Sequence, residues 1–335
     1  MIDLFTHTPL LNLLLFIFSA IVIWFAGNKL AFYADLLSHK TEMGAAFLGA
    51  LFVGAMTSLP EVATTISAAW MKNASLTINN LFGGIPLQTV ILVFADILLV
   101  KEALTSRATK SILILNGVLL IVLLSLIILP YSLGTTAAFF HIGIWSLVIF
   151  LVYCLMLYVV HQFEKRNHIP LPPEKKKKVK LSNAQLWGIF FFYGFMVFVA
   201  GWFIAVIADV ISIQYQIKSS VVGATGLALV TSLPEIATTF AAIRLRAYTL
   251  AFANIFGSNA LMVALVFLGD GFYREGPILA TLGKEEIFLV GLGILMTSIY
   301  LLGMLRKSKK TIFRMGYDSF LILIIYIAGL AFLLR

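Results

Sequence analysis

The chain is poor in charged residues and nearly free of cysteine. Only 12% of its 335 residues are charged and 61% are hydrophobic, whereas a soluble domain of this length carries about a quarter charged residues. This shortage of charge excludes an ordinary soluble protein and predicts a polytopic membrane protein. Cys154 is the only cysteine, so no intrachain disulfide can form.

The sequence also lacks features that other classes of protein need. Its apolar runs are continuous rather than alternating, which favours membrane helices over a β-barrel. The polar segments contain no nucleophile–base set and no phosphate-binding loop, so neither an enzyme nor a cofactor is expected. The first apolar run lacks the short core and small-residue cleavage site of a secretory signal, and we interpret it as a membrane helix.

Ten apolar stretches are long enough to cross a bilayer, which takes about 20 residues. If the N-terminus is external, the internal loops hold most of the 24 lysines and arginines, as the positive-inside rule requires. We therefore predict an integral membrane protein with both termini external and basic loops in the cytoplasm. The net charge of +9 is then a topology signal, and the expected partner is the lipid bilayer rather than nucleic acid. The stretches lie near residues 10–34, 42–71, 76–100, 109–130, 138–162, 184–210, 218–244, 248–270, 284–305 and 313–334.

A five-residue string occurs twice in the chain. Thr57-Ser58-Leu59-Pro60-Glu61 recurs as Thr231-Ser232-Leu233-Pro234-Glu235, 174 positions later. The same shift aligns about 70 residues without a gap. Each half holds five spans, an odd number, so the second half must enter the membrane in the opposite orientation. The fold class predicted is all-α and polytopic, with ten transmembrane helices as two inverted five-helix repeats, the architecture of secondary transporters.

The repeats define the expected organisation of the chain. The first five-helix repeat covers 1–162, with an α-repeat at about 44–100, and the second covers 184–335, with an α-repeat at about 218–274. The linker 163–183 contains several prolines and the basic run Lys175 to Lys178. Proline and a run of like charge both oppose packed structure, so we expect a mobile cytoplasmic loop. A solvated positive-inside loop is favoured there over a polybasic regulatory site.

Each repeated string puts a glutamate inside an apolar helix. The proline before it removes a backbone donor, which frees the carbonyl of Met56 in one repeat and of Val230 in the other. Together with the neighbouring hydroxyls, the two carboxylates form an all-oxygen set suited to hard cations such as Ca²⁺ and Na⁺. A lone string of this kind is often only a kink. Ionising a glutamate in lipid costs at least ~2.5–3.5 kcal/mol, so the matching pair favours a function.

Other acidic residues also repeat with the same shift. Asp96 matches Asp270 and Asp35 matches Asp209. All four lie near the ends of predicted spans, so interfacial or capping roles are favoured over a place in the ion pathway.

At the repeated strings the chain resembles the cation/calcium antiporter superfamily, and within it the prokaryotic sodium/calcium exchanger branch. That branch carries Gly-[Thr/Ser]-Ser-x-Pro-Glu in each repeat and Gly-Asn-x-x-Gly-Ser-Asn on the next helix. The Gly-Asn-x-x-Glu string of the proton-coupled branch is absent. The resemblance implies alternating-access antiport of Ca²⁺ against Na⁺ in a prokaryotic inner membrane. The corresponding second elements here are Asn79-Asn80-Leu81-Phe82-Gly83-Gly84 and Ala253-Asn254-Ile255-Phe256-Gly257-Ser258-Asn259.

The resemblance also implies roles for individual residues. Ca²⁺ is expected between the two glutamates, assisted by threonine carbonyls. Flanking sodium sites are expected from threonine hydroxyls, from a backbone carbonyl seven residues before each glutamate, and from the serine of the second element. The full set of predicted metal-binding residues is Glu61, Glu235, Thr57, Thr231, Ser58, Ser232, Ser258, Gln88, Gly54 and Ala228.

Two departures from the family pattern leave the coupling ion open. Gly84 stands where a serine is expected, and Met262 and Gln88 stand where the family carries Asn or Asp. Gln88 can donate one amide oxygen, but Met262 offers no hard oxygen ligand. A proton-coupled or K⁺-dependent exchanger of Ca²⁺ or another divalent cation on the same fold is therefore the alternative. A cation channel or a non-transporting membrane scaffold is a third hypothesis, against which the doubled proline–glutamate helices argue.

Overall fold

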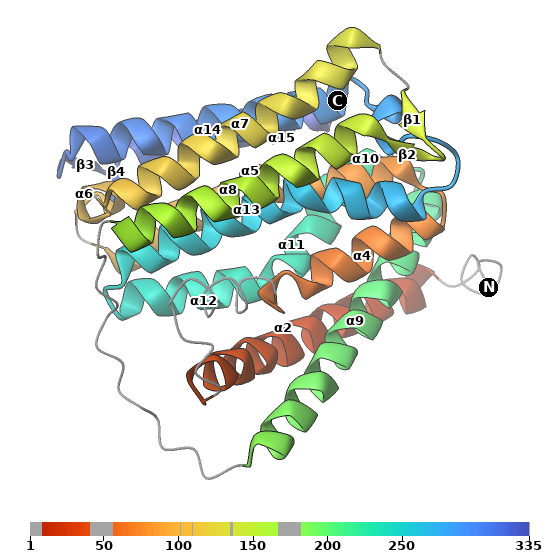
Figure 1. Ribbon diagram of the computed structural model, residues 1–335, viewed down its shortest axis with the longest axis horizontal. Helices are drawn as coiled ribbons and strands as arrows, with labels where there is room; N and C mark the ends of the chain where they lie inside the picture. Colours follow the sequence, from red (N-terminus) through yellow and green to blue (C-terminus); the bar gives the residue numbers. More distant parts are fainter. Residues whose placement is uncertain are drawn as a thin grey trace.

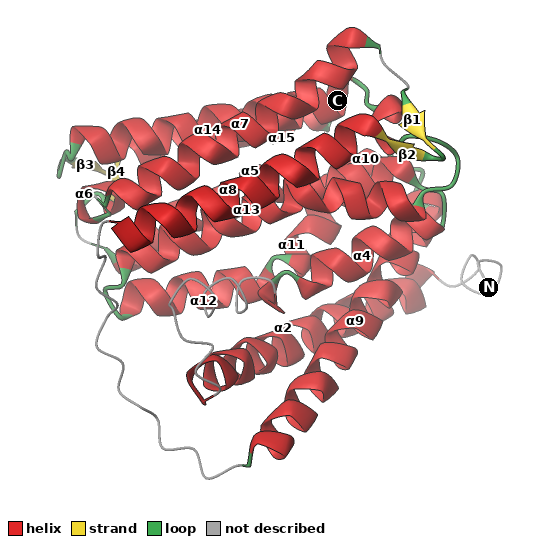
Figure 2. Ribbon diagram, viewed as in Figure 1, coloured by secondary structure: helices red, strands yellow, loops and turns green. Residues whose placement is uncertain are grey.

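The computed structural model describes residues 9–40, 56–100, 102–108, 110–134, 137–166 and 182–334, and these form a helical bundle (Figures 1 and 2). The predicted ligand Gly54 and the basic run Lys175 to Lys178 lie outside the described residues. The helices of the first half are α2 (Pro9–Lys40), α4 (Leu59–Trp70), α5 (Ala74–Leu99), α6 (Leu104–Arg107), α7 (Ser111–Leu133) and α8 (Ile144–Arg166). Those of the second half are α9 (Asn183–Gln214), α10 (Ser219–Val222), η1 (Gly223–Leu227), α11 (Ala228–Thr231), α12 (Leu233–Arg244), α13 (Tyr248–Phe272), η2 (Ile278–Thr281), α14 (Lys284–Arg306) and α15 (Tyr317–Leu333).

The predicted spans correspond to these helices, and the all-helical membrane fold is confirmed. Among the described residues, α2, α5, α7, α8, α9, α13 and α14 are long and apolar enough to cross a membrane. The stretch predicted at 218–244 is not one straight helix, because α12 bends by 50° from the segment before it. The last stretch is the shorter helix α15, and the stretch predicted at 42–71 is described only from Met56 onward.

The two halves correspond element by element. A shift of 174 maps α2 onto α9, α4 onto α12 and α6 onto η2, and a shift of 173 maps the starts of α7 and α8 onto those of α14 and α15. Two short antiparallel hairpins also match: β1 (Ala138–Phe139) pairs with β2 (Ile142–Gly143), and β3 (Thr311–Ile312) pairs with β4 (Met315–Gly316). The sequence analysis did not predict the hairpins, because strands of two residues are too short to produce a periodic pattern.

The repeats run in opposite directions through the bundle. The end of α5 lies against β4, because Asp96 accepts a hydrogen bond from the Gly316 amide (2.9 Å). The end of α13 lies against β2, because Asp270 accepts one from the Gly143 amide (2.6 Å). Figure 1 places the two hairpins at opposite ends of the molecule, so the central helices α5 and α13 are antiparallel, as inverted repeats require.

The central helices α5 and α13 are the most enclosed of the long apolar helices, whereas α2 and α8 are largely exposed on their outer faces. In Figure 1, α2 and α9 lie on one side of the bundle and α7, α14 and α15 on the other, with α4 and α12 between. Glycines let α2 approach α12 closely and let α9 approach α4. A Cβ atom added to Gly27 of α2 would lie 2.7 Å from Cγ of Pro234, and one added to Gly201 of α9 would lie 2.7 Å from Cβ of Ala63. Such small residues allow membrane helices to pack backbone to backbone.

Two ion pairs join loops at one end of the bundle. Lys72 and Glu275 approach to 2.5 Å, and Lys218 and Glu285 to 2.7 Å. All four residues lie in loops, or next to loops, that the sequence-based topology places on the external side of the membrane. The contacts therefore agree with chain crossings that alternate in direction.

Asp96 and Asp270 each accept hydrogen bonds from three donors, one in the segment that follows in the chain and two in the other half of the protein. Asp96 accepts from the Leu104 amide (3.0 Å), the Gly316 amide and the Ser319 hydroxyl (2.7 Å). Its counterpart Asp270 accepts in the same way from the Ile278 amide (2.6 Å), the Gly143 amide and the Ser146 hydroxyl. Both aspartates are fully buried in the protein. They act as caps that fix the start of α6 or η2 and the hairpin that leads into α15 or α8.

Replacing Asp96 by alanine is expected to destabilise the protein without impairing the site described below. The change leaves three buried donors unpaired, at about 1–3 kcal/mol each in other proteins. We expect a loss of about 3 kcal/mol or more, measured as a lower unfolding temperature in detergent, with cation transport per folded molecule retained. Glu275→Ala, which removes an exposed ion pair, is the control and should change stability by less than about 1 kcal/mol. Loss of transport in Asp96→Ala at unchanged stability would instead place Asp96 in the ion pathway.

Candidate functional site

Both repeated strings lie where a helix is interrupted near the middle of the bundle. Helix α4 begins at Leu59 and α12 at Leu233, and in each case the preceding serine leaves the helical geometry (ψ of 13° at Ser58 and 4° at Ser232). Proline is then the second residue of the new helix, where a missing amide donor costs nothing. Figure 1 shows α4 and α12 running from this central region toward opposite ends of the molecule.

The interruption brings the polar residues of both strings into the protein interior. The side chains of Thr57, Ser58 and Glu61 are at most 1% exposed, and those of Thr231, Ser232 and Glu235 are fully buried. The predicted residues Gln88 of α5 and Ser258 of α13 are also buried. The two strings meet, because Ser58, three residues before Glu61, donates a hydrogen bond to Glu235. The structure therefore brings the predicted side chains of both repeats together.

The second-repeat glutamate is bound by hydroxyl groups from both repeats. Ser58 donates to Glu235 Oε1 at 3.1 Å, and Ser258 donates to the same oxygen at 3.4 Å. The two serine hydroxyls lie 3.2 Å apart. In addition, the Gln88 amide donates to the Ser232 hydroxyl at 3.1 Å. Residues far apart in sequence thus form one polar cluster across the interface of the repeats.

Several acceptor atoms in this cluster receive no hydrogen bond from the described residues. They include both carboxylate oxygens of Glu61, the second oxygen of Glu235 and the amide oxygen of Gln88. A buried carboxylate without a donor or a counter-charge is strongly unfavourable. Because these atoms are all acceptors, a cation is the group that would satisfy them. Carboxylate, amide and hydroxyl oxygens suit hard cations.

The described residues contain no cluster of three or more His, Cys, Asp or Glu side chains. The side chains that hydrogen-bond to Glu235 and Ser232 in this cluster are Ser58, Ser258 and Gln88, all of which are uncharged.

The asparagines of the second motif position the backbone next to each glutamate. Asn80 donates to the Thr64 hydroxyl (3.0 Å), which in turn donates to the Pro60 carbonyl (3.0 Å). Asn254, Thr238 and Pro234 repeat this chain with the same distances. Each asparagine therefore lies on the next helix, α5 or α13, and its hydrogen bonds hold the start of α4 or α12 in place.

The predicted backbone ligand Ala228 already accepts two hydrogen bonds. Its carbonyl receives the Ser232 amide at 3.1 Å and the Thr231 hydroxyl at 3.2 Å. A cation bound at this carbonyl would have to replace or share one of them. The ligand roles of Ala228 and of the threonine carbonyls stay predictions.

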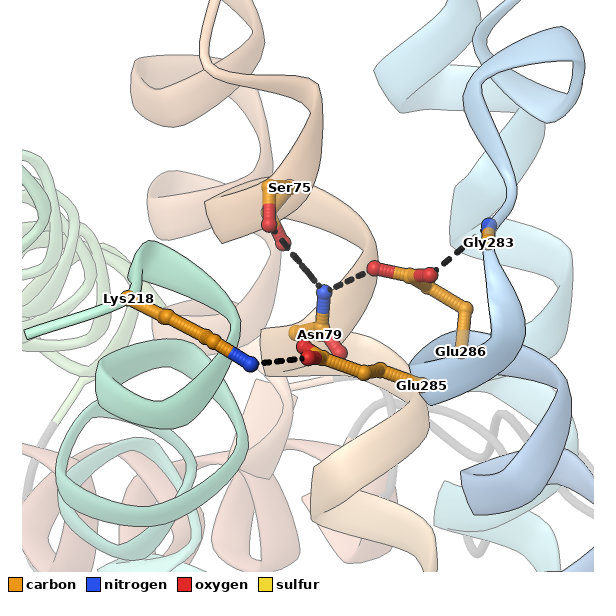
Figure 3. A network of polar contacts seen from close by, with 6 residues as sticks. All are labelled: Ser75, Asn79, Lys218, Gly283, Glu285 and Glu286. Atoms are coloured by element: carbon orange, nitrogen blue, oxygen red, sulfur yellow. Dashed lines mark hydrogen bonds and ion pairs between the residues drawn. The ribbon is translucent and has the colours of Figure 1, made fainter. Parts of the chain in front are cut away.

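Two features near the site were missed by sequence reasoning. The π-helix η1 precedes the interruption in the second repeat, and π-helical turns are frequent at functional sites. At one end of α5, Asn79 donates to the buried Glu286 carboxylate (2.5 Å) and to the Ser75 carbonyl (2.9 Å), beside the Lys218–Glu285 pair (Figure 3). The sequence holds no signal for the Asn79–Glu286 contact, since the two residues are 207 positions apart.

The fold and this buried acidic cluster between inverted repeats define the class of membrane transporters with a midplane site. The model of the family described as sodium/calcium exchanger protein matches residues 11–159 and 184–335. The chain therefore belongs to the sodium/calcium exchanger protein family, and it is a transporter-family protein rather than an enzyme.

Individual relatives support the fold. The uncharacterized membrane protein MJ0091 of Methanocaldococcus jannaschii is 22% identical over 317 residues, which cover 94% of this chain and 96% of the relative. The solved H⁺/Ca²⁺ exchanger CAX has a TM-score of 0.69 at 14% identity, covering 96% of this chain and 85% of that one. The sodium-calcium exchanger NCX_Mj, soaked with Na⁺ and Sr²⁺, has a TM-score of 0.61 at 18% identity, covering 96% and 98%. At these identities the structural matches establish the fold alone.

Proposed function

We propose that this protein is a secondary-active antiporter that exchanges Ca²⁺ for Na⁺ by alternating access. The observation that carries the proposal is the buried pair Glu61 and Glu235, three of whose four carboxylate oxygens accept no hydrogen bond from the described residues. A divalent cation between them would balance both charges. The hydroxyls of Ser58 and Ser258 and the amide oxygen of Gln88 supply neutral ligands for the same ions.

The inverted repeats support the transport cycle. Each repeat contributes one glutamate on an interrupted helix, so a rocking motion of one part against the other would expose the same site to either side of the membrane. The distribution of basic residues supports an orientation with both termini external. A proton-coupled or K⁺-dependent exchanger remains the alternative, because Gly84 and Met262 withhold two ligand positions that a sodium-coupled exchanger is expected to use.

Calcium flux under separate gradients distinguishes these proposals. Proteoliposomes are loaded so that only a Na⁺, only a K⁺ or only a H⁺ gradient is present, and ⁴⁵Ca²⁺ uptake is followed. We expect uptake with the Na⁺ gradient and little with the others, because the repeated strings resemble those of the sodium/calcium exchanger branch and the Gly-Asn-x-x-Glu string of the proton-coupled branch is absent. Uptake driven by H⁺ or K⁺ without Na⁺ selects the alternative. Calcium current without any counter-ion would indicate a channel, and absence of all flux from the folded protein would contradict transport.

A further inference from the structure

A crevice lies between the ends of α14 and α15, at the end of the bundle where the β3–β4 hairpin joins them. Its volume is about 220 Å³, and it is lined by both helices, by the segment between them and by Thr105 of α6. Figure 1 places α6 and the β3–β4 hairpin together at this end of the molecule. Sites that enclose a whole small molecule measure about 300–1,000 Å³, so this crevice suits one part of a larger ligand.

The lining of the crevice combines apolar and polar side chains. Leu302 and Leu321 belong to it and are 65% and 46% exposed. Because both lie on apolar membrane helices, this exposure places them on a face that meets lipid. Tyr317, Ser308 and Thr105 add hydroxyl groups. Tyrosine is typical of the boundary between the hydrocarbon core and the headgroups, so the crevice lies at headgroup depth.

Two exposed cationic side chains line the crevice without an acidic partner. They are Arg306, at the end of α14, and Lys310, just before β3. Among the described residues, the acid that forms ion pairs at this end is Glu102, and it contacts Arg107 (2.9 Å) and Lys309 (3.9 Å) instead. Arg306 and Lys310 are therefore available to an anion from outside the protein.

One carboxylate lies in the same crevice and opposes an anion. Asp318 is in the first turn of α15, where the helix dipole favours a negative charge, and its Oδ2 atom accepts no hydrogen bond from the described residues. Two glycines leave room for it, since a Cβ atom on Gly303 would lie 2.9 Å from its Cγ atom and one on Gly316 would overlap its Oδ1 atom. The two cations outnumber this single acid, so the lining keeps a net positive charge.

The matching hairpin of the first half indicates that the fold does not depend on these cations. The 173-residue shift relates Arg306 to Leu133 and Lys310 to Ala137. The β1–β2 and β3–β4 hairpins nevertheless pair in the same register. The positive-inside rule explains why basic residues gather at one end of the protein. It does not require two of them to share a crevice between helices that face lipid.

From these observations we propose that the crevice binds an anionic phospholipid, with its phosphate at Arg306 and Lys310 and an acyl chain along Leu302 and Leu321. Lysine and arginine form strong charge-assisted hydrogen bonds to phosphate oxygens, and basic pockets between membrane helices bind acidic headgroups in other proteins. The hydroxyl of Tyr317 can donate a further hydrogen bond. The small volume agrees with a site that holds the headgroup while the chains stay in the bilayer.

Binding of tritiated phosphatidylglycerol to the purified protein in an uncharged detergent tests the proposal. We expect saturable binding that excess unlabelled phosphatidylglycerol displaces. Phosphatidylcholine with the same chains should displace little, because its headgroup has no net charge, and inorganic phosphate should displace little, because it has no chains. Equal displacement by phosphatidylcholine, or no saturable binding, would overturn the proposal. Equal displacement by inorganic phosphate would overturn the assignment to a lipid.

Substitutions inside and outside the crevice test where the lipid binds. Each lysine or arginine near an anionic headgroup strengthens binding about fivefold, so Arg306→Gln combined with Lys310→Gln should raise the dissociation constant about 30-fold. Lys307→Gln combined with Arg314→Gln removes two charges that do not line the crevice and should raise it less than about threefold. Equal losses would indicate diffuse attraction to a basic surface and would overturn the site. If a double variant does not fold, Lys310→Gln and Lys307→Gln repeat the comparison with one charge each.

Discussion

Glutamine at position 61 or 235 is expected to reduce Na⁺-driven Ca²⁺ flux by about 100-fold or more. Each substitution removes one of the two charges that balance the bound cation, and breaking a buried charge pair in other proteins costs about 3–5 kcal/mol. One factor of ten corresponds to about 1.4 kcal/mol. The two variants should lose flux to a similar extent, since both carboxylates contribute to the same site.

The same chemical change outside the site is the control. Glu285 forms an exposed ion pair with Lys218, so Glu285→Gln should keep flux within about twofold of the wild type. Initial rates of ⁴⁵Ca²⁺ uptake are normalised to the amount of folded protein in each vesicle preparation. Flux that survives in both Glu61→Gln and Glu235→Gln would refute the assignment of the site.

Alanine at position 83 is expected to destabilise the protein strongly, although alanine at the matching position 257 is not. A Cβ atom on Gly83 would collide with the Cα and Cβ atoms of Ala224 and would lie 2.8 Å from its carbonyl oxygen. Relief requires α5 and the π-helix η1 to move apart, since the obstacle is backbone. By contrast, a Cβ atom on Gly257 has no neighbour within 4 Å.

Thermal unfolding in detergent measures this difference. Overpacking a close contact typically costs about 1–3 kcal/mol, so for a chain of this length Gly83→Ala should lower the unfolding temperature by about 2–4 °C. Gly257→Ala should change it by about 2 °C or less, because alanine is favoured over glycine in a helix. Equal shifts for the two variants would contradict the close approach of α5 to η1.

The sequence was sufficient to predict the features that depend on local composition and on the repeat. The apolar runs predicted the helical membrane fold, and the recurrence of Thr57 to Glu61 predicted which side chains meet in the interior. Proline in the repeated string also indicated a disturbed helix. The size of the bend is 50° between the two segments of the second repeat. It depends on packing against other helices, and no sequence pattern predicts it.

Contacts between residues far apart in the chain could not be predicted from the sequence. Ser58 reaches a glutamate 177 positions away, and Met262 fills the space beside Gly84 on another helix. Each of those two residues was recognised as a departure from the family pattern, but their contact was not. Asp96 and Asp270 were predicted as interfacial or capping residues. Their capping role agrees with the structure. Both are buried because each half folds a hairpin over the aspartate of the other half, and so short a hairpin leaves no periodic pattern in the sequence.

Diffraction from crystals soaked in Sr²⁺, a Ca²⁺ analogue with usable anomalous scattering, tests the central claim most directly. The account predicts an anomalous peak between the carboxylates of Glu61 and Glu235, with oxygen ligands at about 2.3–2.6 Å as for calcium, and its disappearance in Glu61→Gln. A peak at any other buried position, or none at concentrations that support flux, would contradict the claim that the paired glutamates bind the transported cation.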